Sequence, residues 1–227
     1  MIPKIIHYIW VGDKDIPDFY LECMSTWRTY APEFDIVLWN EEKIKLTFGN
    51  LDFLAKMLNK KKYAFASDYI RCLILERFGG VYLDTDIELI KDISDLCNNT
   101  GFIGLESPGM PACGIMGAVD GFWFFSELKD AVIRAEGLVT IPQLAKKILS
   151  EKGNLEEKTS VPFILSDMKI FPEQYFYPYN PYAPNGRDQL LYKDVTEKCY
   201  CIHHWAKSWK LSLVERAIKF LKKKLCK

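Results

Sequence analysis

The chain has 227 residues, with 30 basic and 30 acidic side chains. Hydrophobic residues make up 49% of it and aromatic residues 14%, which excludes intrinsic disorder, a collagen-like repeat and a coiled coil. The balanced charge also excludes a nucleic-acid binder that relies on overall positive charge. The length fits one domain with a sizeable hydrophobic core.

Apolar periodicity and turn residues divide the chain into strands and helices. Their alternation in the first half predicts an α/β protein with a doubly wound, mostly parallel sheet. The stretch 160–192, with five prolines among tyrosines and phenylalanines, is predicted to be rich in loops. In chain order we expect a strand at 5–11, a helix at 18–30, a strand at 35–39, a helix at 41–62 with a break at 49–50, a helix at 64–78, strands at 81–83, 102–105 and 115–118, helices at 122–136 and 141–151, a strand at 199–205 and a helix at 211–225.

The charge is unevenly spread along the chain. Residues 207–227 hold eight basic side chains and one acid, so they carry +7 and residues 1–206 carry −7. We expect 1–210 to form the main domain and 211–227 to form a basic amphipathic helix. That helix either docks on the same domain or binds an anionic membrane surface.

Cysteine usage indicates the compartment. The seven cysteines include no CxxC pair and lie mostly inside apolar runs, so we expect free thiols in a reducing compartment. The first residues do not resemble a signal peptide, and no apolar run is long enough to cross a bilayer. We therefore expect a cytoplasmic protein, peripheral on the inner face of the plasma membrane if the basic helix is an anchor.

The sharpest chemical signal is Asp84-Thr85-Asp86, which follows Gly79-Gly80 and the apolar strand 81–83. Ligands of open α/β sheets bind beyond the carboxyl ends of strands. Two carboxylates there offer hard oxygen ligands to Mg²⁺ or Mn²⁺ bridging a diphosphate, whereas the alternative is a turn-capping role. Asp68 and Arg71 share a helix face, where they form an ordinary ion pair or hold sugar hydroxyls.

Three ordered segments carry a resemblance: IPKIIHYIWVG at 2–12, ASDYIR at 66–71 and GGVYLDTDIE at 79–88. They are similar to the DxD-containing sugar transferases. This group includes yeast mannosyltransferases and bacterial capsule and lipopolysaccharide enzymes, and it is related to the catalytic domains of clostridial glucosylating toxins. The resemblance implies a GT-A-like fold, a nucleotide-sugar donor, a divalent metal (Mn²⁺ or Mg²⁺) and retention of anomeric configuration.

The resemblance also implies roles for individual residues. Trp10 stacks on the nucleotide base, with core packing as the alternative, and Tyr82 lies near the ribose. Asp84 contacts ribose, sugar or a metal-bound water, and Asp86 binds the metal directly. His7 is expected to be a structural or supporting residue. The implied catalytic set is Asp68, Arg71, Asp84 and Asp86.

The segment 199–209, CYCIHHWAKSW, resembles the part of the family that closes over the metal and diphosphate. His203 then completes the metal shell, and Lys207, Ser208 and Trp209 contact the phosphates. A zinc site is the alternative, although the spacing offers no tetrahedral set. Related toxins have an Asn in the segment that reads ACGIMGA at 112–118 here, so its role is either absent or taken by backbone near Cys113–Gly114.

Together these features predict a retaining, metal-dependent glycosyltransferase. It would move a hexose or N-acetylhexosamine from a nucleotide-diphosphate sugar, with UDP favoured, to a glycan or lipid-linked glycan in bacterial surface polysaccharide synthesis. One alternative is a non-catalytic nucleotide-sugar or glycan-binding protein, which the intact Asp84/Asp86 pair disfavours. Another is a DxD phosphatase, whose motif calls for Thr or Val where Glu88 stands. The aromatic stretch 175–182 either stacks on acceptor sugars or packs on the core.

Overall fold

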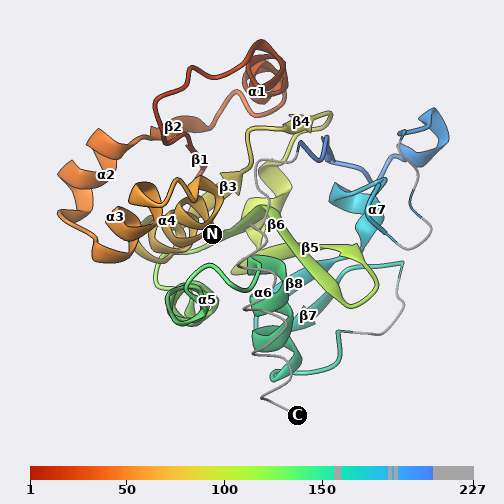
Figure 1. Cartoon of the computed structure of the whole chain (residues 1–227). Helices are drawn as coiled ribbons and strands as arrows, with labels where there is room; N and C mark the ends of the chain where they lie inside the picture. The colour runs from red at the N-terminus through yellow and green to blue at the C-terminus, as the bar shows by residue number, and fades with distance from the viewer. Residues whose placement is uncertain (156–159, 184–185, 187–188, 207–227) are drawn as a thin grey trace.

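A seven-stranded sheet forms the centre of the computed structural model, which describes residues 1–155, 160–183, 186 and 189–206. A two-stranded ribbon, β4-β9, lies beside this sheet (Figure 1). The strands are β1 (Ile5–Ile9), β2 (Asp35–Trp39), β3 (Gly80–Leu83), β4 (Ile87–Leu89), β5 (Gly101–Ser107), β6 (Met110–Ala118), β7 (Phe163–Leu165), β8 (Met168–Phe171) and β9 (Cys201–His203). The helices are α1 (Asp18–Tyr30), α2 (Glu41–Phe48), α3 (Asp52–Asn59), α4 (Tyr63–Phe78), α5 (Trp123–Ala135), α6 (Ile141–Ser150) and α7 (Glu173–Phe176), with 3₁₀ turns η1 (Ser94–Asn98) and η2 (Tyr192–Asp194).

The strand order of the sheet is β2-β1-β3-β6-β5-β8-β7. Strand β1 runs parallel to both β2 and β3, and β5 runs parallel to β8. Strand β6 runs antiparallel to its neighbours β3 and β5, and β7 runs antiparallel to β8. The predicted α/β class is confirmed. Because β6 pairs with β3, the β5-β6 hairpin places its own residues beside the end of β3.

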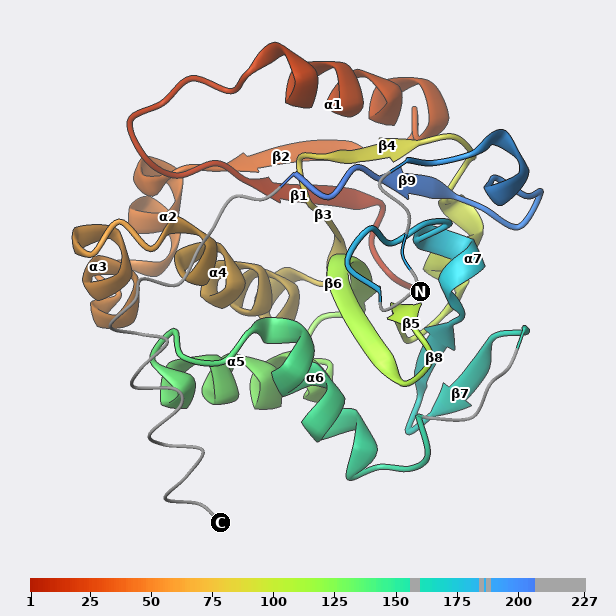
Figure 2. The same ribbon diagram turned by 45° about the vertical axis from the view of Figure 1, so that its right-hand side comes forward.

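The two faces of the sheet are covered differently. Helices α2 to α6 lie on one face, where α4 and α5 pack together over the large hydrophobic cluster that includes Ile70, Ile74 and Phe125. Helix α1, the β4-β9 ribbon and α7 cover the other face, over a cluster that includes Trp27 and Phe176. Figure 2 shows α1 and the ribbon on the side opposite α4 to α6. The end of β3, which leads into Asp84, therefore lies between these two hydrophobic clusters.

The junction between α4 and β3 depends on two glycines. Gly79 has a φ of +63° and Gly80 a φ of +93°, a backbone region that side chains rarely adopt. A Cβ at position 79 would lie 2.7 Å from the Ala118 carbonyl oxygen, and one at position 80 would lie 2.8 Å from Nε2 of His7. The glycine pair thus ends the helix and lets the chain enter the middle of the sheet directly before the acidic motif.

Several elements differ from the expectation drawn from sequence. Helix α1 and strand β2 have the predicted bounds, and the break predicted at 49–50 within 41–62 is confirmed by Gly49, whose φ is +74°. The second half, α3, ends at Asn59 rather than at 62. The stretch 160–192 contains β7, β8 and α7, and β4 follows the acidic motif. The predicted helix 211–225 and the boundary at 210 lie outside the described residues. Across the helices that the structure describes, none combines the length and apolarity needed to span a bilayer.

Candidate functional site

The acidic motif forms the turn between β3 and β4. The backbone N–H of Asp84 donates to the Gly114 carbonyl at 2.8 Å, which ties the end of β3 to β6. The N–H of Ile87 donates back to the Asp84 carbonyl at 3.0 Å and closes the turn. Asp86 is only 5% exposed, so its charge must be balanced by nearby groups.

Arg71 is the centre of an ionic network on α4. Its guanidinium lies 3.3 Å from Oδ1 of Asp68, on the same helix face, and 3.1 Å from Oδ1 of Asp84. It donates to the Cys113 carbonyl at 2.8 Å and lies 4.4 Å from the centre of the Tyr82 ring. Tyr82 in turn donates its hydroxyl to Oδ1 of Asp84 at 2.8 Å. The network fixes one oxygen of Asp84.

Burial governs the charges in this network. Burial alone would lower the pKa of Arg71, but the Asp84 and Asp68 carboxylates raise it above the ordinary arginine value. Burial raises the pKa of Asp68 to about 7, although Arg71 opposes the rise. Burial also raises the pKa of Asp84. Arg71 is therefore a permanent cation that holds two carboxylates of reduced acidity.

Asp86 is held by the chain segment around β9. His203 places Nε2 at 3.3 Å from Oδ1 of Asp86, and the N–H of Ala206 donates to Oδ2 at 2.8 Å. The N–H of His204 donates to the Asp86 carbonyl at 3.1 Å, next to the β4-β9 pair Ile87↔His203. Although burial opposes it, the interaction with His203 lowers the pKa of Asp86. Burial lowers the pKa of His203, but the carboxylates around it, Asp86 first, produce a net rise.

Asp84, Asp86 and His203 could together hold a metal ion. Each offers one ligand atom, and these atoms all lie within 4.8 Å of one another. Gly114 leaves room for them, because a Cβ there would be 3.2 Å from Oδ2 of Asp84 and 3.7 Å from Nε2 of His203. Two carboxylates and one imidazole are a suitable donor set for Mn²⁺ or Mg²⁺. The residues present fit the divalent metal that the sequence predicts.

Two aromatic residues, His7 within β1 and Trp10 directly after it, have different surroundings. Trp10 is partly exposed, donates its indole N–H to the Lys14 carbonyl at 2.6 Å, and has its ring 5.6 Å from the Tyr20 ring. It is therefore not a core residue, and its predicted role in base stacking stays a prediction. His7 is buried, and its ring nitrogens contact the Trp39 indole and the Gly79 carbonyl. The expected structural role of His7 agrees with these contacts.

Sequence reasoning assembled the main cluster correctly but missed several of its contacts. Asp68, Arg71, Tyr82, Asp84, Asp86 and His203 are brought together. The carbonyl of Cys113 and the backbone at Gly114 contact the network, as one of the two alternatives for this segment supposed. Glu106 was not predicted, and its signal was an acid directly after the apolar run 101–105. Tyr177, in the aromatic stretch 175–182, packs on the core, which was one of the two alternatives for that stretch. Lys207, Ser208 and Trp209 lie outside the described residues.

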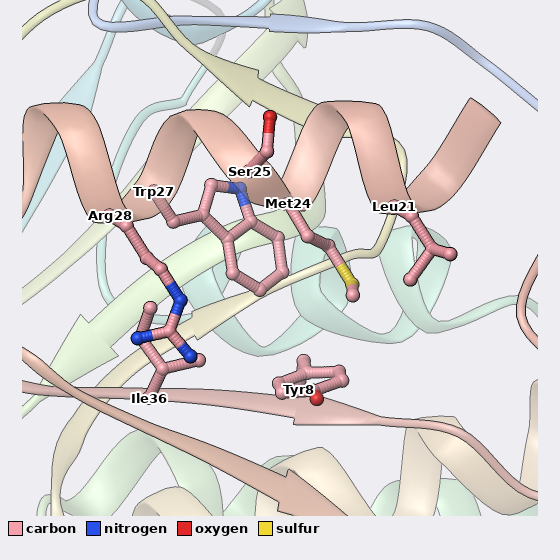
Figure 3. A pocket seen from close by; sticks show the side chains of 7 residues that line it. All are labelled: Tyr8, Leu21, Met24, Ser25, Trp27, Arg28 and Ile36. Carbon is pink, nitrogen blue, oxygen red and sulfur yellow. The ribbon is translucent and has the colours of Figure 1, made fainter. Parts of the chain in front are cut away.

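The structure also contains a pocket away from this cluster. A cavity of about 200 Å³ lies between α1 and strands β1 and β2, and none of its lining residues belongs to the ionic network. Figure 3 shows Tyr8 and Ile36 on the strands facing Met24, Trp27 and Arg28 of α1. The candidate functional site is therefore defined by the buried charges rather than by this cavity.

Comparison with protein families places the ionic network in a known sequence context. A profile described as "Glycosyltransferase sugar-binding region containing DXD motif" matches residues 17–103, which include Asp68, Arg71, Asp84 and Asp86. This chain is similar to the DXD-containing glycosyltransferases. The resemblance expected from the three sequence segments is thereby confirmed.

Curated relatives of the sugar-binding region include two yeast proteins. Inositol phosphoceramide mannosyltransferase 3 of Schizosaccharomyces pombe is 26% identical over 130 residues, which is 56% of this chain and 36% of the relative. Inositol phosphoceramide mannosyltransferase 1 of the same yeast is 32% identical over 108 residues, or 45% of this chain and 33% of the relative. The chain therefore spans about a third of the length of these relatives.

Solved structures share the fold. PaToxG glycosyltransferase superposes with a TM-score of 0.55 at 16% identity, covering 66% of this chain and 68% of that one. The apo form of the glycosyltransferase GlyE from Streptococcus pneumoniae superposes with a TM-score of 0.52 at 11% identity, covering 97% of this chain and 60% of that one. The GT-A-like fold is therefore confirmed.

Proposed function

We propose that this protein is a retaining glycosyltransferase that takes a hexose or N-acetylhexosamine from a nucleotide-diphosphate sugar. The observation that carries the proposal is the cluster of Asp84, Asp86 and His203, whose ligand atoms lie within 4.8 Å beside the Arg71 network. A divalent metal held there would supply positive charge for the diphosphate leaving group. The match of residues 17–103 to a sugar-binding region supports the same chemistry.

Each residue of the site then has its own role in the transfer reaction. Arg71 orients Asp84 and Asp68, so that carboxylate oxygens and guanidinium N–H groups meet the hydroxyls of the donor sugar. Trp10 packs on the nucleotide base, and Lys207, Ser208 and Trp209 contact the phosphates. The acceptor oxygen bonds to the anomeric carbon on the face from which the diphosphate departs. The bond to the diphosphate oxygen breaks, and the acceptor proton leaves with the diphosphate.

The substrates are also part of the proposal. A UDP-sugar is the donor expected from sequence, and the mannosyltransferase names of the yeast relatives add a mannose donor to the test. The acceptor expected from sequence is a glycan of a bacterial surface polysaccharide, such as capsule or lipopolysaccharide. The names of the same relatives suggest an inositol phosphoceramide-like lipid as a second acceptor class. A cytoplasmic location, with the basic segment on an anionic membrane, would suit a lipid-linked acceptor.

Nucleotide release from a panel of UDP- and GDP-sugars tests this function directly. We expect release from one donor with Mn²⁺, loss of release with EDTA, and a fall of about a thousandfold in Asp86→Asn, because a lost metal ligand removes several kcal/mol of leaving-group stabilisation. Asp130→Asn is the matched control, since Asp130 is exposed on α5. Absence of release from every donor, together with no thermal shift by UDP or GDP plus Mn²⁺, would exclude the proposed function.

A further inference from the structure

Glu106 is a carboxylate beside the metal cluster that the proposed chemistry does not use. It lies near the end of β5 and is only partly exposed. Within the described residues, no ion pair or hydrogen bond reaches its carboxylate. Burial raises the pKa of Glu106 to about 7, and His203 is the charged neighbour that opposes the rise. Because its carboxylate has no direct partner among the described residues, Glu106 is available to a ligand.

The position of Glu106 on the hairpin directs it to the site. A Cβ on Gly104, two residues earlier, would meet Phe176 and Tyr177 at 2.6 and 2.9 Å. A Cβ on Gly114, on the paired strand β6, would lie 3.4 Å from the Tyr177 hydroxyl and 3.7 Å from Nε2 of His203. These two glycines therefore share the hairpin face that covers Tyr177 and His203. The β5-β6 pairing shifts register between Leu105 and Ser107, and Glu106 at this shift interacts electrostatically with His203.

A row of aromatic rings leads from His203 to the surface. The Trp205 ring lies 4.4 Å from the His203 ring and 5.9 Å from the Tyr182 ring, which is at 84° to it. Tyr182 is 53% exposed. Trp205 has a φ of +58°, a strained conformation for a bulky residue, and its indole N–H donates to the Tyr179 carbonyl at 2.8 Å. The backbone at Trp205 is therefore strained, and its ring lies between the His203 and Tyr182 rings.

Asn180 joins the backbone at Glu106 to the aromatic row. Its side-chain amide donates to the Glu106 carbonyl at 3.4 Å, and its side-chain oxygen accepts from the N–H of Tyr182 at 2.8 Å. The Tyr182 hydroxyl reaches the Trp205 carbonyl at 3.4 Å. The loop around Asn180 therefore fixes the positions of Glu106, Tyr182 and Trp205 relative to one another, at the edge of the metal cluster.

We propose that Glu106, Trp205 and Tyr182 form the subsite that binds the acceptor, a neutral sugar or polyol. The inference rests on the proposed function and extends it to the acceptor. Tyr and Trp faces pack against the apolar face of a sugar ring, and a carboxylate accepts hydrogen bonds from its hydroxyls. A carboxylate beside these rings repels phosphate, so this subsite does not hold the nucleotide diphosphate. Under this proposal the diphosphate binds at the metal cluster and the acceptor hydroxyls bind at Glu106.

The test uses the full chain and three neutral probes: methyl α-mannoside, methyl β-galactoside and myo-inositol. Binding is measured by saturation-transfer NMR, and transfer is measured against donor hydrolysis. We expect wild type to bind at least one probe. Glu106→Gln and Tyr182→Ala should weaken its binding about tenfold and lower the ratio of transfer to hydrolysis by a similar factor, as for losing a hydrogen bond to a charged group. Tyr192→Ala is the control, because Tyr192 is 96% exposed.

The outcomes separate this inference from the proposed function. If wild type hydrolyses no donor but binds a probe through Glu106 and Tyr182, the transferase proposal fails and the subsite stands. If wild type binds none of the three probes, or if both variants bind as wild type does, the subsite assignment is wrong. Circular dichroism of each variant distinguishes lost binding from lost folding.

Discussion

His7, which is buried, and His203, which is half-buried, serve different purposes, and their partners explain the difference. His7 accepts from the Trp39 indole N–H at Nδ1, 3.1 Å away, so its other nitrogen carries the proton and donates to the Gly79 carbonyl at 3.0 Å. His203 directs Nε2 at Asp86, while its buried Nδ1 has no hydrogen-bond partner among the described residues. Both ring nitrogens of His7 have partners, whereas among the described residues only one ring nitrogen of His203 has a partner.

The pKa directions follow from these surroundings. Burial among neutral partners lowers the pKa of His7 to about 4, so that its ring is neutral in the folded protein. His203 lies among carboxylates, which raise its pKa despite burial. A histidine whose hydrogen bonds are complete supports the fold, whereas one left incomplete beside acids is suited to an ion or a substrate.

The largest effect expected from this comparison is the pH dependence of stability that His7 produces. The unfolded ring takes up a proton near pH 6.5 and the folded ring only near pH 4, so stability is full above 6.5 and is lost as the pH falls toward 4. The free energy of unfolding should fall by about 3 kcal/mol over this window. Urea denaturation at several pH values measures it. His7→Gln should lose this pH-dependent component, and an unchanged slope in that variant would assign the effect to other groups.

Replacement of His203 should have the opposite effects: a large effect on metal binding and a small effect on stability. We expect His203→Gln to weaken Mn²⁺ binding about 10- to 100-fold, because the imidazole ligand is lost. The Gln amide still offers Asp86 a hydrogen-bond donor, so the free energy of unfolding without metal should fall by only about 1 kcal/mol. Titration calorimetry and urea denaturation measure the two quantities. His204→Gln is the matched control, since His204 contacts Glu88 rather than the cluster. Equal Mn²⁺ affinity in wild type and His203→Gln would remove His203 from the ligand set.

The smallest effect comes from the glycines of β6. In Gly114→Ala the new Cβ would press on Oδ2 of Asp84 at 3.2 Å, so Mn²⁺ affinity should fall severalfold with a stability loss of about 1 kcal/mol. In Gly117→Ala the Cβ would instead meet the Phe102 ring at 2.6 Å, so stability should fall more and affinity less. The two variants together distinguish the effect of a Cβ beside the metal ligands from the effect of a Cβ in the hydrophobic core. A parallel loss of affinity in both would contradict this division.

The sequence predicts the parts of this fold that are local. The helix 18–30 and the strand 35–39 have clear periodicity and end signals, and the structure has the same bounds. Strands β4 and β9 have three residues each and exist because they pair with each other across the chain. Strand β9 lies inside the predicted strand 199–205, whereas β4 carries too little periodicity of its own to be predicted.

The candidate site divides in the same way. Asp84 and Asp86 were predictable because their motif directly follows an apolar strand, and the spacing of Asp68 and Arg71 placed those two on one helix face, with their role implied by the resemblance. The resemblance supplied His203. The Cys113 carbonyl and the Ala206 N–H were not predictable, since backbone groups leave no signature in a sequence and their roles depend on tertiary contacts. Glu106 became visible only when the hairpin showed which side faces His203.

The position of Ala206, 120 residues after the carboxylate that it binds, bears on how the protein is made. A ribosome synthesises the sheet centre and both aspartates long before the β9 segment emerges, so a nascent chain holds two of the three ligands without the third. Closing so long a loop carries an entropic penalty that the β4-β9 pairing and the contacts to Asp86 must offset. A metal ion held by all three residues would therefore be bound firmly only late in biosynthesis, after the chain has been translated through His203.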